Sequence, residues 1–126
     1  MANSPGYKKW PDHNIIEEHP NKRVVVTFEG ENIANSTSAI KVIEDNHPPR
    51  YYIPREDVNM DVLEPSDTTS HCPFKGTAHY YSIKAGDHQA ADAIWSYEEP
   101  YDEHQDLKNY LAFYDEEVDR LEVSVS

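Results

Sequence analysis

Cysteine is nearly absent from this sequence, which contains only Cys72 among its 126 residues. A single cysteine excludes a disulfide within the chain and a structural zinc site built from several cysteines. The sequence also lacks a Gly-rich phosphate loop, a dinucleotide fingerprint and a Ser-His-Asp order. No motif therefore identifies a reaction, and we predict neither a metal ion nor a cofactor.

Basic side chains are scarce as well, because 11 Lys and Arg stand against 24 Asp and Glu, for a formal net charge of −13. Nucleic-acid backbones and anionic membrane surfaces attract basic patches, so we expect neither as a partner. No apolar run approaches the roughly 20 residues of a membrane helix. Residues 1–11 lack the apolar core of a signal peptide, and we expect a cytoplasmic protein.

Glycine is also rare, with four residues against nine Pro and nine Tyr, a composition that suits strands joined by stiff turns. Short β-branched and aromatic runs between turn residues predict about seven to nine strands. The clearest covers residues 23–29, with a hairpin turn at Gly30. Residues 39–44 favour a strand, although a helix is the alternative there. The pattern predicts an all-β sandwich or barrel-like packing.

The chain is long enough for one domain with one core. We expect residues 1–22 to form an N-terminal tail and edge segment, with a short edge strand within 13–19, and residues 23–126 to form a single domain. Residues 65–70 and 98–105 are predicted to be polar loops. The last strand is predicted over residues 120–126.

The chemically richest stretch is Cys-Pro-Phe-Lys-Gly-Thr-Ala-His-Tyr-Tyr at residues 72–81. Pro73 fixes its own φ and pushes Cys72 into an extended conformation, while Gly76 suits a positive φ. A strand follows the glycine, so Cys72, Lys75 and His79 are candidates for one pocket. The alternative is a tight turn that caps a buried strand, with Cys72 as a small hydrophobe.

Three separated stretches carry a family resemblance. They are Tyr-Tyr-Ile-Pro-Arg-Glu-Asp-Val at residues 51–58, the run at 72–81, and Trp-Ser-Tyr-Glu-Glu-Pro at 95–100 followed by Leu-Ala-Phe-Tyr at 111–114. In this order they resemble the small bacterial proteins grouped as domain of unknown function 427, also labelled nucleotidyltransferase-like. The likeness covers about residues 23–125.

The resemblance implies a β-tent fold, in which two antiparallel sheets of short strands lean together, with one or two short helical turns. Methionine-R-sulfoxide reductases and the thalidomide-binding domain of cereblon share this fold. Many of these proteins hold zinc through paired cysteines, and the lone Cys72 implies that this chain has no such site. Several relatives bind small ligands between the sheets, which implies a cleft there.

The candidate ligand-binding residues combine charge with aromatic surface. They are Tyr52, Arg55, Asp57, Cys72, Lys75, His79, Trp95 and Tyr97. Arginine offers a planar fork for a carboxylate or phosphate, and aromatic side chains form walls for a flat or cationic ligand. The alternatives are a local Arg55–Asp57 ion pair, a solvated Lys75 and a core position for Trp95.

The histidines are scattered along the chain. His71 and His79 lie near Cys72, but no standard metal-ligand spacing supports a site there. The others are expected on the surface: His13, His19, His47, His88 and His104.

We therefore predict a domain that binds a small polar or anionic ligand in a cleft between its sheets. One alternative is an enzyme of group-transfer type, in which Arg55 and Lys75 stabilise negative charge and Asp57 or His79 is the general base. Another is an interaction module that uses a sheet edge. A homodimer is also possible. The first two hypotheses require Arg55 and Lys75 to meet at one hollow.

Overall fold

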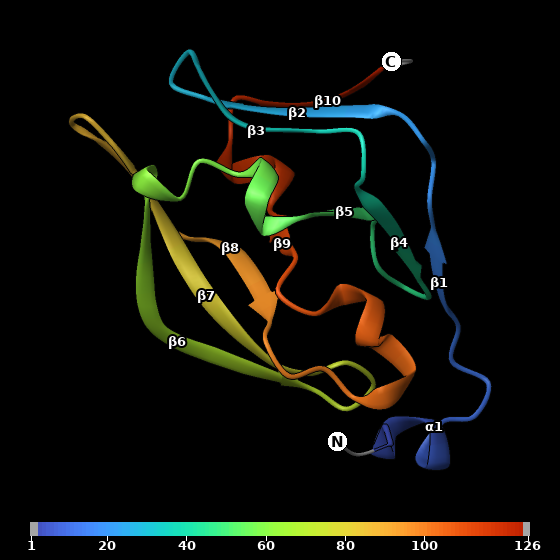
Figure 1. The fold of residues 1–126 in the computed structure, drawn as a ribbon. Helices are drawn as coiled ribbons and strands as arrows, with labels where there is room; N and C mark the ends of the chain where they lie inside the picture. The colour runs from blue at the N-terminus through green and yellow to red at the C-terminus, as the bar shows by residue number, and fades with distance from the viewer. Residues whose placement is uncertain (1–2, 125–126) are drawn as a thin grey trace.

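The computed structural model describes residues 3–124, which fold into two antiparallel β-sheets (Figure 1). The smaller sheet has the order β10-β2-β3, and the larger has the order β1-β4-β5-β9-β8-β7-β6. The strands are β1 (Ile15–Glu18), β2 (Arg23–Phe28), β3 (Glu31–Ser36), β4 (Ile40–Glu44), β5 (Arg50–Ile53), β6 (Leu63–Cys72), β7 (Gly76–Ala85), β8 (His88–Tyr97), β9 (Leu111–Phe113) and β10 (Arg120–Ser124). The prediction of an all-β chain with two antiparallel sheets is confirmed.

Helical structure is limited to short pieces at the ends and corners of the sheets. The α-helix is α1 (Pro5–Lys9), and the 3₁₀ helices are η1 (Arg55–Asp57), η2 (Met60–Val62), η3 (Asp102–Leu107) and η4 (Asp115–Glu117). The prediction that residues 98–105 form only a loop is wrong, because η3 begins within them. Backbone bonds such as His104 N–H to Tyr101 O, at 2.9 Å, close its turns without any apolar pattern that the sequence would reveal.

The hairpin between β2 and β3 follows directly from the sequence. Val24, Val26 and Phe28 alternate with more exposed residues and are buried on one face of β2. Glu29 and Gly30 both have positive φ, of 50° and 80°, which is the conformation of a two-residue hairpin turn. After Ser36 the chain crosses to the larger sheet as β4, so the strand favoured over residues 39–44 is confirmed from Ile40 to Glu44.

Strand β6 corrects a second loop prediction. Residues 65–70 belong to this strand, and Pro65, Thr69 and Ser70 pair with β7 on either side of a register shift. β6 lies at an edge of the larger sheet, where Pro is tolerated and solvent reaches much of the strand. Its polar residues therefore lack the apolar alternation that marks a half-buried strand.

Apolar side chains cover both faces of the larger sheet. The core between the sheets includes Val24 and Val26 of β2 with Ile53, Ile94 and Phe113, all fully buried. Burial of each such side chain contributes about 1.5–3 kcal/mol. The predicted inward-facing Leu121 and Val123 of β10 pack against this core, while residues 125–126 of that predicted strand lie outside the described range.

A second cluster covers the opposite face of the larger sheet. It contains Ile40, Tyr52, Trp95, Tyr97 and Leu107, among others. Adjacent residues of a strand point to opposite faces, so Ile53 and Ile94 enter the core between the sheets while their neighbours Tyr52 and Trp95 join this second cluster. The aromatic candidates of the sequence therefore share the face turned away from the smaller sheet.

Candidate ligand-binding site

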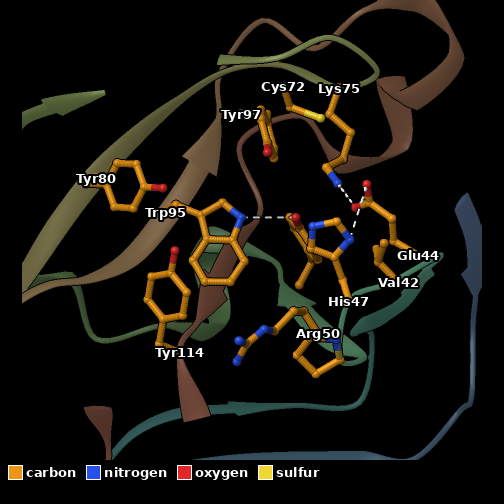
Figure 2. A pocket seen from close by; sticks show the side chains of 12 residues that line it. Val42, Glu44, His47, Arg50, Cys72, Lys75, Tyr80, Trp95, Tyr97 and Tyr114 are labelled. Carbon is orange, nitrogen blue, oxygen red and sulfur yellow. Dashed lines mark hydrogen bonds and ion pairs between the residues drawn. The ribbon is translucent and has the colours of Figure 1, made fainter. Parts of the chain in front are cut away.

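A pocket of about 220 Å³ opens on that aromatic face of the larger sheet (Figure 2). Its lining residues are Val42, Glu44, His47, Pro48, Arg50, Tyr52, Cys72, Lys75, Tyr80, Trp95, Tyr97 and Tyr114. Among the described residues, none from β10, β2 or β3 lines it. The prediction that the cleft lies between the two sheets is therefore wrong for this pocket. Apolar side chains fill the space between the sheets.

Strand alternation explains which side chains reach the pocket. On β5, Arg50 and Tyr52 point to it, and on β8 Trp95 and Tyr97 do the same. β4 ends at Glu44, whose side chain lies two residues beyond Val42 on the same face. The sheet order places β4 and β5 side by side, so residues far apart in sequence meet at one hollow.

The turn between β6 and β7 supplies Lys75. Cys72 pairs with Gly76 across the start of this hairpin, and Gly76 has the predicted positive φ, of 124°. A Cβ on Gly76 would lie 3.4 Å from the carbonyl oxygen of Glu99, so the neighbouring chain approaches closely there. Lys75 O also accepts a 2.9 Å hydrogen bond from Tyr101 N–H. These contacts fix the turn, and Lys75 is buried rather than solvated.

Lys75 and Glu44 form an ion pair inside the pocket, with Nζ 2.5 Å from Oε1. Their side chains are only 7% and 11% exposed, so each charge depends on the other to offset its desolvation. Burial alone would raise the pKa of the Glu44 carboxyl. The hydrogen bond and charge of Lys75, with a further hydrogen bond from His13, outweigh burial and lower this pKa.

Aromatic residues form the floor and one wall. Trp95 Nε1–H donates to the Tyr52 hydroxyl oxygen at 3.0 Å, and the Tyr52 and Tyr97 rings are stacked with centroids 6.4 Å apart. The Tyr97 hydroxyl has no hydrogen-bond partner among the described residues, and Figure 2 shows it directed into the pocket. Burial raises the pKa of both phenols, so both stay protonated donors near neutral pH.

Arg50 provides a second cation at the opposite side of the pocket. Its guanidinium carbon lies 5.1 Å from the Tyr114 ring centre and 5.8 Å from that of Trp95, within cation–π range (Figure 2). Nη1 donates to Glu116 at 3.1 Å. Arg50 Nε and Nη2 donate no hydrogen bond to any group within residues 3–124. Burial and the hydroxyl of Tyr80 raise the pKa of Tyr114 to about 12.

The structure brings five of the eight predicted residues together. They are Tyr52, Cys72, Lys75, Trp95 and Tyr97.

Arg55 lies on the other face of the sheet. Its guanidinium donates to the Tyr81 hydroxyl at 3.1 Å and to Ser96 Oγ at 3.3 Å. Ser96 stands between Trp95 and Tyr97 on β8, so its side chain points away from the pocket. The expected convergence of Arg55 and Lys75 is therefore wrong. The sequence does not show that Arg55 contacts Ser96, so alternation along β8 could not assign Arg55 to this face.

The other two predicted residues also lie elsewhere. The Asp57 carboxylate accepts a 2.6 Å hydrogen bond from Ser36 Oγ and joins η1 to β3, while Arg55 pairs with Glu98, at 3.9 Å, rather than with Asp57. His79 is paired with Ser96 across β7 and β8 and lines a separate hollow with Glu98. The proposed general bases of the enzyme hypothesis are thus outside the pocket that contains Lys75.

The sequence reasoning missed Arg50 and Glu44, although each stands two residues from a pocket residue on the same strand, Tyr52 and Val42 respectively. That spacing was a signal for Arg50, because Tyr52 was already a candidate, but not for Glu44, because Val42 was not a candidate. The prediction of surface positions was also wrong for two histidines. His104 is 4% exposed, and the His13 side chain is 17% exposed and bound to Glu44.

Within residues 3–124, no group of three or more His, Cys, Asp or Glu side chains is placed to hold a metal ion. The described part of the chain also contains no helix with the length and apolar character of a membrane span.

The fold and pocket define a small all-β protein with an aromatic, cation-bearing pocket on its larger sheet. The chain belongs to the family described as Domain of unknown function (DUF427), whose sequence model matches residues 16–124. No curated protein matches the chain.

Proposed function

We propose that this chain binds a small anionic ligand with a planar apolar part in the pocket between Lys75 and Arg50. The observation that carries the proposal is the imbalance between donors and acceptors that face the pocket. An anion offers several acceptor oxygens, and charge-assisted hydrogen bonds to it are the strong ones.

Donors with unused capacity surround the pocket. Lysine has three donor protons, and Glu44 takes one from Lys75. The Arg50 fork uses only Nη1 among the described residues. The Tyr97 hydroxyl is free to donate, and the Tyr52 hydroxyl keeps its proton after accepting from Trp95. An acceptor-rich ligand satisfies these groups together.

Acceptors are already engaged. Glu44 is the one carboxylate among the described lining residues, and its two oxygens contact Lys75 and His13. A cationic ligand would have to displace one of these partners. An anionic ligand leaves both contacts in place and adds to them, so the geometry favours the anion.

The aromatic surface selects the rest of the ligand. Trp95 and Tyr114, with ring centres 4.5 Å apart, stand beside Arg50. The Tyr97 ring stacks on Tyr52, and its centre lies 5.9 Å from Lys75 Nζ. Flat rings favour a flat partner, because offset stacking and edge contacts add to area burial. The volume of about 220 Å³ limits the ligand to a small molecule, below the usual range of drug-sized sites.

The shifted pKa values favour binding over acid–base catalysis. A general base works best when its pKa lies near the working pH. Burial moves the pKa of Tyr52 and Tyr97 upward, away from neutrality. These phenols therefore serve as constant hydrogen-bond donors, which suits ligand recognition.

Calorimetric titration with benzoate and its neutral analogue benzamide tests this proposal. Both probes have the same ring, and only benzoate carries the charge. We expect the protein to bind benzoate and to bind benzamide at least about tenfold more weakly, the effect of one charge-assisted hydrogen bond of about 1.5–3 kcal/mol. Absence of saturable benzoate binding, or equal affinity for the two probes, contradicts the proposal.

Variant Tyr97→Phe identifies the site. It removes a hydroxyl that has no hydrogen-bond partner within residues 3–124, so the fold is expected to retain its stability while benzoate affinity falls by about fivefold or more. The matched control is Tyr51→Phe, because Tyr51 precedes Tyr52 on β5 and packs against the core on the opposite face. The control is expected to leave affinity unchanged.

A further inference from the structure

Residues 3–14, here called the N-terminal strap, lie before the family match at residues 16–124 and yet contact the turn that carries Lys75. Gly6 N–H donates to Pro73 O at 2.8 Å, and Ser4 Oγ donates to Phe74 O. Two consecutive carbonyl groups of the turn thus receive hydrogen bonds from the strap, and Ser4 is fully buried in doing so.

The Phe74 side chain is enclosed by the strap. The His13 ring stacks on it, with centroids 4.2 Å apart and planes 15° apart, and the Tyr7 ring meets it edge-on at 4.9 Å. A Cβ at Gly6 would lie 2.7 Å from the Phe74 ring and 2.8 Å from Pro73 O. This approach requires glycine at position 6.

The other side of the strap is fixed to the body of the domain. The buried His104 ring donates from Nδ1 to Glu17, at 2.7 Å, which leaves Nε2 to accept the Tyr7 hydroxyl proton at 2.8 Å when the ring is neutral. Ser4 N–H donates to the Glu103 carboxylate at 2.9 Å. The strap is therefore held at several points, and its last residues are aimed at β4.

His13 connects the strap to the pocket. Its Nε2–H donates to Glu44 Oε2 at 2.9 Å, while Lys75 donates to the other oxygen, Oε1. The carboxylate is thus held from both sides, between a lysine of the pocket and a histidine outside it. His47 Nδ1, at 3.8 Å from Oε2, is too far for a hydrogen bond and is mostly exposed.

We propose that the N-terminal strap contributes to ligand binding, and that His13 is a positioning residue that holds Glu44 in place beside Lys75. The claim about affinity rests on the proposed anion binding, and the claim about Glu44 stands without it. With Oε2 bound to His13, the carboxylate is held beside Lys75, and Lys75 presents its remaining protons to the pocket. Without His13, the carboxylate is free to turn inward and repel an anion.

Two substitutions of His13 separate its hydrogen bond from its packing. His13→Phe keeps an aromatic ring against Phe74 and removes the donor, whereas His13→Gln keeps a donor and removes the ring. The ligand-free readout is the pKa of the Glu44 carboxyl, followed by carbon NMR. We expect His13→Phe to raise this pKa and His13→Gln to keep it near the wild-type value.

Gly6→Ala perturbs the strap at a position that does not contact Glu44. It also provides a test if His13→Phe fails to fold. Because the added methyl group collides with Phe74 and Pro73, it displaces the strap and is expected to raise the pKa of Glu44 as His13→Phe does. His88→Phe is the control, since His88 is exposed at the start of β8 and its partner is Glu29, at 3.6 Å, rather than Glu44. An unchanged pKa of Glu44 in both His13→Phe and Gly6→Ala overturns the proposal.

Benzoate titration adds the affinity arm. His13→Phe is expected to weaken benzoate binding about fivefold, the effect of one net hydrogen bond of about 1 kcal/mol. If wild-type protein binds no benzoate, anion binding fails while the NMR result still decides the role of His13. If benzoate binds and His13→Phe leaves its affinity intact, the claim that the strap contributes to binding is wrong and the proposed function stands.

Discussion

Lys75 and Glu44 form a direct ion pair in the pocket, although 31 positions separate them in the sequence. Glu44 ends a strand and Lys75 stands in a turn between two others, so only the folded sheet brings them together. A buried pair of this kind is sensitive to the loss of one partner, because the remaining charge keeps its desolvation cost.

Lys75→Met is therefore expected to lower the free energy of unfolding by about 3–5 kcal/mol, since it leaves the Glu44 charge buried without its main partner. The double variant Lys75→Met/Glu44→Gln removes both charges and is expected to recover much of that loss. Urea unfolding of the two variants and the wild type measures the difference. Equal stabilities for the single and double variants would show that the pair contributes little.

The lowered pKa of Glu44 predicts a particular response to acid. Because the folded-state value lies below the ordinary value of 4.5, the ionised carboxylate stabilises the fold above that pH, and this contribution is lost as the pH falls through the folded-state pKa. Wild-type protein is expected to lose more stability than Glu44→Gln between pH 5 and the acid limit of folding, about pH 3. Urea unfolding at several pH values gives both curves, and parallel curves contradict the expectation.

The positive φ of Gly76 predicts a cost for any side chain at that position. Gly76→Ala is expected to destabilise the fold by about 1–3 kcal/mol, because its φ of 124° strains an L residue. The comparison is Gly86→Asn at the β7–β8 turn, where φ is 61° and the space is open, and where we expect a change of less than about 1 kcal/mol. Thermal unfolding of the two variants distinguishes these outcomes.

The position of Arg55 predicts a separation of stability from binding. Arg55→Ala removes the donors to Tyr81 and Ser96 and is expected to cost about 1–3 kcal/mol of stability with unchanged benzoate affinity. Arg50→Ala is expected to do the opposite and reduce benzoate affinity by about tenfold or more. Calorimetry and urea unfolding on both proteins test this pair. A loss of benzoate affinity in Arg55→Ala would indicate that the ligand binds on the face of the sheet that carries Arg55, and would contradict the proposed pocket.

Local patterns predicted much of this fold. The alternation around Val24 and Val26 and the turn at Gly30 identified the first hairpin, and the Cys72–Gly76 turn was correctly placed before its strand. The edge strand β6 escaped prediction because its polar residues face solvent and carry no period. Short 3₁₀ helices such as η3 escaped it because backbone bonds rather than side-chain patterns define them.

The pocket was only half predictable, for a reason of topology. Trp95 and Tyr97 share a strand face by simple alternation, so their common position could be read from the sequence. Arg55 was assigned to the same cleft because its planar fork suits an anion and it follows a strand closely, but Pro54 and the turn of η1 carry it to the other face. Glu44 was overlooked because the pairing of β4 with β5 is not encoded in any local pattern.

The two tryptophans offer the most direct test of the central claim that the pocket on the larger sheet binds an anion. Trp95 Nε1–H bonds to Tyr52 at the pocket floor, whereas Trp10 lies on the strap and is half exposed. In a nitrogen–proton NMR titration, with the indole signals assigned through Trp10→Phe, we expect benzoate to shift the Trp95 signal saturably and benzamide to have little effect. An unmoved Trp95 signal, or the same saturable shift with both probes, would contradict the account.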